Sequence, residues 1–442
     1  YDRDGSFDLL FVDSGPWSMP WPFATAREGF NTLRLYRNLG NGRFEETTRA
    51  AGLTGDHGYG MSVAVGDVDG DGWPDLFLAN VGSNRLFRNQ EGRFAEDPAA
   101  GAAGDRDAWS SSAAFFDADA DGHLDLFVAN YVQWSREIDF EVDYRLTGIG
   151  RAYGPPTNFA GTQPYFYRND GTGRFEEATD AAGLFVRNTA TGEAMGKGLA
   201  VVPVDLEGDG DLDIVVANDT VRNFAFINDG SGRFTEQGTE LGLGFDRNGH
   251  ATGAMGIDVA QPFGDASLAI AIGNFANEMS SLYLSADGFA FADEAIGRGI
   301  GAPSRSALTF GLFFFDYDLD GRADFLQVNG HVENNINQVQ ASQRYAQQAQ
   351  LFWNCACAQS FIEVPREQTG DLASPIVGRG ASYFDLEGDG VLELVLTQVG
   401  GPPLLLKQAT RPAGGWLRLQ PLVRSEGGPA IGAVVEVEVE VG

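Results

Sequence analysis

Short apolar segments alternate with polar turns along the whole chain. Met61–Val65, Ser112–Phe116 and Leu312–Phe315 each precede an acidic turn. A second apolar segment follows each turn and ends at an asparagine, as Asp75–Asn80 does. Nearly continuous apolar runs of this length are typical of β-strands that are covered on both faces. The pattern therefore predicts pairs of buried strands joined by acidic loops.

A third predicted strand in each repeat runs into a hairpin with a recurring sequence. The hairpins contain Asn, Asp and Gly, which suit tight turns, and they end at a Phe that begins a fourth strand. Clear copies span residues 37–44, 88–94, 168–175 and 227–234. Seven repeats of four antiparallel strands predict an all-β fold, the seven-bladed β-propeller.

The acidic loop between the first and second strands has the spacing of a cation site. In Asp67–Asp75, carboxylates occupy positions 1, 3, 5 and 9, and Gly72 occupies position 6. Alternate side chains of a tight loop converge on one point, and Ca²⁺ takes about six to eight oxygen ligands. An EF-hand needs Glu at position 12, where this loop has Leu78. The spacing therefore predicts a Ca²⁺ loop between two strands.

Six copies of this loop predict five or six bound Ca²⁺ ions. By analogy with EF-hand loops, positions 1, 3, 5 and 9 would give side-chain oxygens and position 7 a backbone carbonyl. A seventh, degenerate copy from Asp258 to Ile272 keeps the flanking strands and, of the acids, only the first. The predicted ligands are Asp2, Asp4, Asp8, Asp67, Asp69, Asp71, Trp73, Asp75, Asp117, Asp119, Asp121, His123, Asp125, Asp205, Glu207, Asp209, Asp211, Asp213, Asp316, Asp318, Asp320, Arg322, Asp324, Asp385, Glu387, Asp389, Val391 and Glu393.

The connections sort onto two faces of the predicted ring. In an up-and-down blade the 1–2 loops and 3–4 hairpins share one face, here called the metal face. The opposite face carries the variable insertions between strands 2 and 3 and is called the recognition face, since binding usually resides on loops held by a rigid scaffold. The insertions span residues 13–31, 131–164, 275–280 and 330–350, and a short helix is predicted at 338–350.

Aromatic residues in two insertions are candidate contacts for a partner, because Trp and Tyr are frequent interface anchors. They are Trp17, Trp21, Phe23, Tyr131 and Trp134. The alternative, that these rings cover the end of the propeller, stays open.

The charge and the cysteines limit the partners and the compartment. A net charge of −32 disfavours nucleic acid and anionic membranes as partners. No apolar run reaches the ~20 residues that a membrane span needs. Cys355 and Cys357 lie in a predicted 3–4 hairpin, where a small disulfide fits an oxidising compartment and free thiols are the alternative. Zinc and haem motifs are absent from the sequence, so neither group is expected.

The sequence contains no recognisable catalytic motif. His57, His123, His250 and His331 are dispersed, and neither HExxH nor G-x-S-x-G occurs. We therefore expect a protein that is not an enzyme. An enzyme with a polar site at the central channel remains an alternative, which a cluster of His, Arg and carboxylates at the channel mouth would favour.

The repeated motifs resemble those of the FG-GAP/VCBS repeat proteins, which include the integrin α-chain propellers. The chain is most similar to bacterial relatives of cartilage acidic protein, which end in an ASPIC/UnbV segment. The supporting segments are 154–156, 216–219, 254–258, 329–332, 378–381, 416–419 and 430–434. The resemblance implies a secreted, calcium-binding, seven-bladed propeller with an interaction role, comprising residues 1–410. Residues 411–442 resemble an incomplete ASPIC/UnbV segment and are expected to form closing strands.

These expectations combine into one functional hypothesis. The chain is expected to be extracellular, periplasmic or at the cell surface, and to bind envelope or extracellular proteins or glycans through the recognition face. Its first residues match the acidic loop from position 2 onward, so residues upstream are expected, and whether they include a signal peptide or lipid anchor stays open. Oligomeric assembly, with the chain as a scaffold subunit of a larger envelope complex, is a further alternative.

Overall fold

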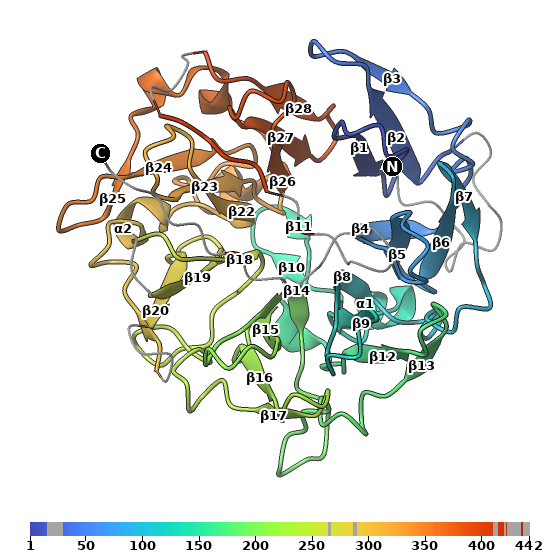
Figure 1. The fold of residues 1–442 in the computed structure, drawn as a ribbon. Helices are drawn as coiled ribbons and strands as arrows, with labels where there is room; N and C mark the ends of the chain where they lie inside the picture. The colour runs from blue at the N-terminus through green and yellow to red at the C-terminus, as the bar shows by residue number, and fades with distance from the viewer. Residues whose placement is uncertain are drawn as a thin grey trace.

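The structure is a computed structural model that describes residues 1–15, 30–263, 267–285, 290–409, 414–419, 421 and 435. Seven sheets are arranged radially around a central axis (Figure 1). This arrangement confirms the predicted all-β, seven-bladed propeller. Among the described residues, no helix is long and apolar enough to cross a membrane.

Blades 2 to 6 each have four antiparallel strands, with the first strand nearest the axis (Figure 1). Their strands are β4 (Tyr59–Gly66), β5 (Asp75–Val81), β6 (Arg85–Gln90), β7 (Arg93–Glu96); β8 (Ser110–Phe116), β9 (Asp125–Asn130), β12 (Tyr165–Asn169), β13 (Phe175–Glu177); β14 (Gly198–Val204), β15 (Asp213–Asn218), β16 (Phe224–Asn228), β17 (Phe234–Glu236); β18 (Ile257–Ala260), β19 (Leu268–Ile272), β20 (Ser281–Ser285), β21 (Ala292–Asp293); and β22 (Thr309–Phe315), β23 (Asp324–Asn329), β24 (Gln350–Asn354), β25 (Phe361–Glu363).

The first and last blades differ from the prediction of four strands in every repeat. Within the described residues, blade 1 contains β1 (Leu9–Val12), β2 (Leu33–Asn38) and β3 (Phe44–Glu46). Blade 7 contains β26 (Gly378–Phe384), β27 (Glu393–Gln398) and β28 (Leu404–Leu406). Residues 1–8 supply only the loop that precedes a second strand, so β1 takes that role in blade 1. Phe384 and Val395 pack against Phe11 and Phe44 where the ring closes.

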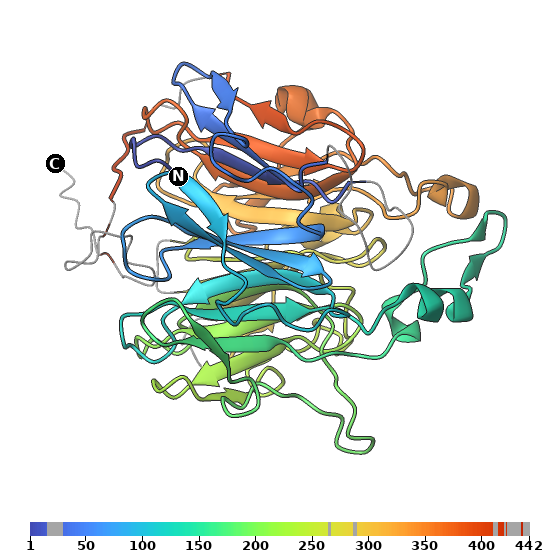
Figure 2. The ribbon, with the colours of Figure 1, turned by 90° about the vertical axis from the view of Figure 1, so that its right-hand side faces the viewer.

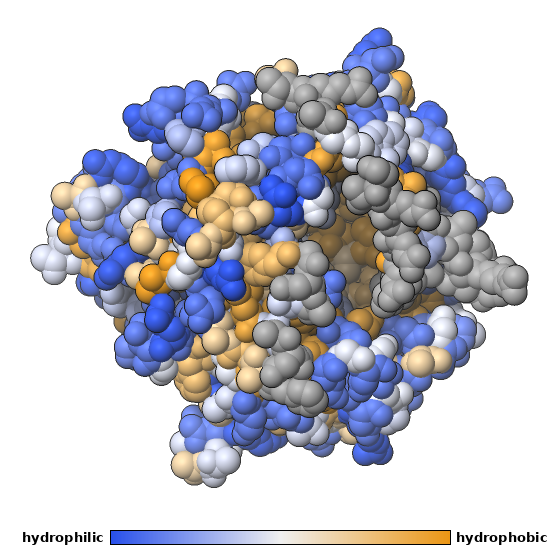
Figure 3. Space-filling view, turned by 60° about the vertical axis from the view of Figure 1, so that its left-hand side comes forward, coloured by the Kyte–Doolittle hydropathy of each residue, from blue (hydrophilic) through white to orange (hydrophobic). Residues whose placement is uncertain are grey.

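Hydrophobic contacts between blades hold the ring together. Every residue of β5, β9, β15 and β23 is buried, which explains their continuous apolar sequences. Between blades 3 and 4, Phe116, Phe127 and Phe226 belong to one packed cluster. Burial of one such side chain contributes about 1.5–3 kcal/mol. One face of the molecule is hollowed, and hydrophobic residues line the hollow (Figure 3).

Asparagines at the ends of third strands join several blades to the preceding one. Asn169 Nδ2 donates to Val68 O at 2.8 Å, and Asn228 Nδ2 donates to Ala118 O at 2.8 Å. Both acceptors are at position 2 of the preceding acidic loop. Asn354 Nδ2 donates in the same way to Pro262 O at 2.7 Å, which places Gln261 at position 1 of the degenerate loop.

That register corrects the prediction that Asp258 is the first acid of the degenerate loop. Asp258 lies within β18, where its Oδ2 accepts a hydrogen bond from Phe314 N at 2.7 Å. Residue type alone matches Asp258 to the first acid of the loop. Strand pairing and the Asn354 contact instead place Gln261 at position 1. In blade 5 the loop therefore has no acid at position 1.

The insertions project from one side of the ring (Figure 2). The insertion between β9 and β12 contains α1 (Arg136–Val142), β10 (Arg145–Leu146), β11 (Gly150–Arg151) and the 3₁₀ turn η1 (Pro156–Asn158). The helix predicted at 338–350 is wrong: the insertion before β24 has one short helix, α3 (Ile336–Val339). Gln347 exchanges backbone hydrogen bonds with Ile376 of the next connection, which holds this segment extended. The remaining short helices are α2 (Gly301–Ser304), η2 (Arg366–Gln368) and η3 (Gly370–Ala373).

Candidate functional site

Three acidic loops bring their position 1, 3 and 5 carboxylates together. In each of them one oxygen per residue lies within 4.8 Å of the others. The three groups are Asp67, Asp69 and Asp71; Asp117, Asp119 and Asp121; and Asp316, Asp318 and Asp320. All three loops join a first strand to a second strand, as the sequence predicted.

The loop backbone itself holds the first carboxylate in place. Asp67 Oδ2 accepts a hydrogen bond from Gly72 N at 2.7 Å, and Asp71 Oδ1 accepts one from Trp73 N at 2.8 Å. Gly70 and Gly72 have φ of 72° and 85°, a conformation that glycine adopts without strain. The carboxylates are therefore positioned by local backbone geometry. Position 4 also accepts Ala120 and Leu319, both with φ of 56°, whereas position 6 is glycine in all three loops.

Several oxygens in these groups are buried and have no hydrogen-bond partner among the described residues. They are Asp67 Oδ1, Asp69 Oδ1, Asp119 Oδ1 and Asp318 Oδ1. A buried charged oxygen without a partner is costly, and several converging carboxylate oxygens are the donors that Ca²⁺ prefers. The residues present therefore fit a Ca²⁺ ion, which would neutralise the clustered charge.

The position 9 acid has a second role that the spacing did not indicate. Asp75 is 1% exposed; its Oδ1 accepts from Asn89 N at 2.7 Å and its Oδ2 from Val68 N at 3.2 Å. Asp125, Asp213 and Asp324 make equivalent pairs of bonds. Desolvation raises the pKa of Asp75 to about 7 and that of Asp324 to about 8. This acid connects the loop to the third strand and lies outside the three carboxylate groups.

The remaining predicted loops are less convergent. Within the described residues, no such group is formed by the acids of three other loops: Asp205, Glu207 and Asp209; Asp385, Glu387 and Asp389; and Asp2, Asp4 and Asp8. Cationic side chains occupy some carboxylates: Lys407 pairs with Glu387, and Arg37 pairs with Asp2 at 2.9 Å. At position 7, the Arg322 side chain pairs with Asp320 and donates to Asn354 O. The backbone N–H groups of the position 7 residues His123, Asp211 and Val391 donate to the position 5 carboxylates of their loops.

Cys355 and Cys357 form a disulfide in the hairpin between β24 and β25, with their Cα atoms 5.1 Å apart. Cys357 lines a cavity of about 480 Å³ between blades 5 and 6, together with Arg298 and Arg322. Arg298 Nη1 donates to Ser360 Oγ at 2.8 Å. The bridge thus closes the hairpin beside this cavity.

On the recognition face, only some of the predicted aromatic contacts fall within the described residues. Trp17, Trp21 and Phe23 lie outside the described residues. The rings of Tyr131 and Trp134 both pack edge-on against Trp109, with centroids 5.2 and 5.8 Å away. The two described rings therefore form part of one aromatic cluster.

Sequence reasoning missed a polar cluster next to these rings. Tyr131 Oη donates to Asp219 Oδ2 at 2.6 Å, and Asp219 is 7% exposed. Burial raises the pKa of Asp219 to about 6. Lys197, also 7% exposed, donates from Nζ to Pro156 O at 2.6 Å. Glu278 Oε2 accepts from Gly253 N at 2.7 Å, and burial raises its pKa.

The same face holds a buried histidine beside an arginine. His331 is 3% exposed, and burial lowers its pKa to about 4. Its Nδ1 accepts a hydrogen bond from Glu333 N at 3.0 Å, which fixes the proton on Nε2. Arg379 Nη2 donates to His331 O at 3.3 Å. A usable sequence signal existed: the residue after the repeated asparagine differs in each blade, as in Tyr131, Asp219 and Phe275.

Comparisons with known proteins agree with this architecture. Residues 1–78 and 67–128 match the FG-GAP-like repeat family. Together with the ring of seven blades, these matches support an FG-GAP propeller. No curated protein matches the sequence.

Several solved structures are similar to this chain at low sequence identity. A lectin of Agrocybe aegerita that recognises non-reducing terminal N-acetylglucosamine is 16% identical, with 85% of this chain and 88% of that chain covered and a TM-score of 0.48. Sqt1 of Saccharomyces cerevisiae is 12% identical, with 86% and 79% covered and a TM-score of 0.45. The Trypanosoma rangeli sialidase is 11% identical, with 82% and 55% covered and a TM-score of 0.39.

Proposed function

We propose that this chain is an extracytoplasmic, calcium-stabilised propeller that acts as a binding module for extracellular or envelope proteins or glycans. The observation that carries the proposal is the asymmetry of the ring. One face repeats carboxylate groups whose buried oxygens have no partner among the described residues. The other face carries insertions that differ in every blade.

Calcium in this proposal is structural. The ion would neutralise three converging carboxylates and so fix the turn between the first and second strands. Extracellular modules of this kind bind Ca²⁺ with a dissociation constant of ~10⁻⁴–10⁻³ M. Sites of that affinity would be filled only where Ca²⁺ is abundant, so the proposal includes an extracellular, periplasmic or cell-surface location.

The proposal is tested by calorimetric titration of chelator-treated protein with Ca²⁺, and with Mg²⁺ as a control. We expect several equivalent Ca²⁺ sites and a clear preference over Mg²⁺, which demands a near-ideal octahedron. The triple variant Asp67→Asn, Asp117→Asn and Asp316→Asn should bind about three fewer ions. Absence of Ca²⁺ binding in titration and in elemental analysis would overturn the proposal.

A second candidate function, a propeller enzyme, is favoured by one observation. His331, Arg379, Asp219 and Glu278 gather on the recognition face, and Asp219 is hydrogen-bonded to Tyr131. Groups with pKa values displaced by burial are frequent at catalytic sites. Chemical change of a bound ligand that Asp219→Asn abolishes without loss of binding would establish this candidate instead.

A further inference from the structure

The second strands end in the same way in five blades, and the residue that follows differs each time. Asn80, Asn130, Asn218, Asn274 and Asn329 are all at most 5% exposed. The next residues are Val81, Tyr131, Asp219, Phe275 and Gly330. Within one ring of similar blades, a repeated buried residue serves the architecture. The divergent position beside it is free to serve recognition.

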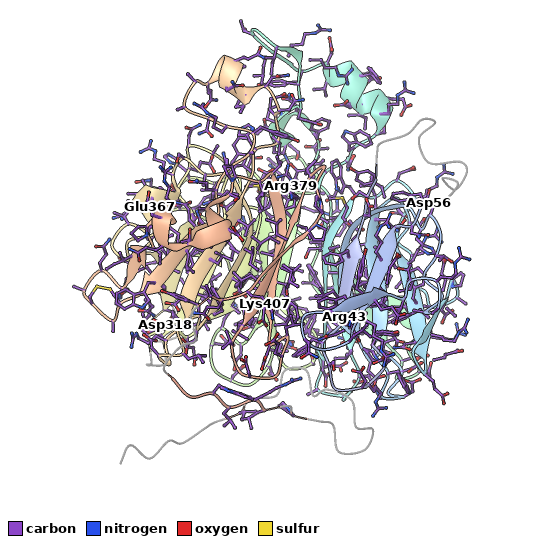
Figure 4. All side chains as sticks on the ribbon, turned by 90° about the horizontal axis from the view of Figure 1, so that it is seen from above. Arg43, Asp56, Asp318, Glu367, Arg379 and Lys407 are labelled. Atoms are coloured by element: carbon purple, nitrogen blue, oxygen red, sulfur yellow. A yellow bond between two sulfur atoms is a disulfide. The ribbon has the colours of Figure 1, made fainter. Side chains whose placement is uncertain are left out.

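A second divergent position lies at the start of the innermost strands. Five of these strands have a bulge there, and bulges re-aim a side chain. The residues at the bulges are Met61, Ser111, Leu199, Phe310 and Arg379. Arg379 is the one charged residue of the five. Figure 4 shows it on the side of the ring from which the insertion projects, whereas Asp318 and Arg43 lie toward the other side.

Arg379 is half-buried, and no carboxylate of the part of the chain that the structure describes pairs with it. Its Nη1 donates to Gly330 O at 3.0 Å and to Gly378 O at 2.7 Å, and its guanidinium lies 4.3 Å from the centroid of the Phe310 ring. No carboxylate of the described residues lies within 4.0 Å of it, although the chain has 62 acids. Burial lowers the pKa of Arg379, because removal from water disfavours its charge. Carbonyl groups do not neutralise that charge, so an anionic ligand group would complete this site.

Contacts connect Arg379 to the Tyr131–Asp219 pair. The ring of Phe275 packs 5.6 Å from that of His331, whose carbonyl accepts from Arg379. At Gly253, a Cβ would lie 2.8 Å from Phe275 Cβ, 3.3 Å from Asp219 Oδ1 and 3.5 Å from Glu278 Oε2. A side chain at this position would collide with Phe275, so Gly253 allows Phe275, Asp219 and Glu278 to pack close together. We call Tyr131, Asp219, Phe275, Glu278, His331 and Arg379 the mouth arc.

The insertion between β9 and β12 approaches the mouth arc from blade 3. Pro156 O accepts from Lys197 before blade 4, and Tyr153 lies within electrostatic range of Arg379 in blade 7. In Figure 1, β10 and β11 of this insertion overlie the middle of the ring. The insertion thus adds polar groups and the exposed ring of Tyr153 beside the arc.

We propose that the mouth arc binds an acidic saccharide, with Arg379 holding the sugar carboxylate and Tyr131, Asp219 and Glu278 hydrogen-bonding its hydroxyl groups. The proposal rests on the proposed function in taking this face as the recognition face. A planar guanidinium matches a carboxylate in two parallel hydrogen bonds. Buried carboxylates accept hydrogen bonds from hydroxyl groups, and the neighbouring rings of Phe275, Tyr153 and Trp109 supply apolar faces for the sugar.

The test is calorimetric titration of the full chain in Ca²⁺ with a tetrasaccharide of alternating glucuronate and N-acetylglucosamine. The control ligand is the same tetrasaccharide with its carboxyl groups reduced to alcohols. We expect the acidic form to bind about tenfold or more tightly than the reduced form, since a charge-assisted hydrogen bond contributes about 1.5–3 kcal/mol. Arg379→Gln should abolish this preference, and Arg379→Lys should keep part of it.

Arg43→Gln is the matched control, because it removes the same charge from an exposed site on the opposite face (Figure 4). Its affinity for the acidic tetrasaccharide should equal that of the unaltered chain. Equal binding of both tetrasaccharides, unchanged binding by Arg379→Gln, or binding of a hexaglutamate peptide in place of the sugar would each overturn the proposal. Calcium titration of the unaltered chain separates the two hypotheses: normal Ca²⁺ binding without binding of the acidic tetrasaccharide contradicts only the saccharide proposal.

Discussion

The metal face and the recognition face are made by the same repeats, yet they use opposite kinds of sequence. On the metal face, six of the seven loops repeat one pattern of carboxylates with glycine at position 6, and Asp75 and Asp324 make the same two backbone contacts. On the recognition face, equivalent positions carry residues as different as Tyr131 and Asp219. Residues that repeat from blade to blade therefore serve the structure of the ring, and residues that differ from blade to blade are the candidates for recognition. The following predictions can break or sharpen this contrast.

Removal of calcium should have the largest effect. At a free Ca²⁺ concentration about ten times the dissociation constant, each site stabilises the native state by about 1.4 kcal/mol. Loss of the ions from several sites in EDTA should therefore lower the melting temperature by about 10 °C, as measured by scanning calorimetry. If the melting temperature is unchanged in EDTA and the acidic tetrasaccharide still binds, then calcium has no structural role and the recognition face does not depend on it.

Replacement of a position 9 acid should destabilise the protein whether or not calcium is present. Asp75→Ala leaves the buried N–H groups of Asn89 and Val68 without an acceptor. We expect a loss of about 3 kcal/mol in urea unfolding, both in Ca²⁺ and in EDTA. A loss confined to Ca²⁺ would instead make Asp75 chiefly a ligand.

Acidification should weaken the recognition face through His331. Its folded-state pKa of about 4 lies below the ordinary value of 6.5, so the unfolded chain binds the proton more readily and stability falls as pH falls through 6.5. Protonation of His331 in the unfolded chain should lower the free energy of unfolding by about 2 kcal/mol between pH 7 and pH 5. His331→Gln should remove that part of the pH dependence, whereas exposed His250→Gln should not; identical slopes in both variants would contradict the assignment.

A single change at position 3 should have the smallest effect. Asp69→Asn keeps the shape of the loop but removes one of three converging charges. We expect a loss of about 1 kcal/mol in Ca²⁺ and almost none in EDTA, measured on the same urea curves as Asp75→Ala. An equal loss in both conditions would show that Asp69 acts through loop geometry alone.

The seven-bladed ring and the position of the acidic loops were predictable because both depend on local, repeated signals. Buried second strands such as Asp75–Val81 appear as unbroken apolar runs, and the glycines of each loop mark its turn. The alignment of Asp258 failed because residue type alone does not fix strand register. The helix at 338–350 failed because pairing of Gln347 with Ile376 depends on another part of the chain.

The sequence by itself determined the repeat, the strands and the carboxylates of the acidic loops, since each depends on residues close together along the chain. Only the tertiary structure decided that Asp75 binds the backbone of the third strand and that three loops converge more closely than the rest. It also decided that Tyr131, Asp219 and Arg379 belong to one surface, although they are distant in sequence. Ring closure brings the blades side by side, and burial at their junctions then sets which charges are paired and which are not.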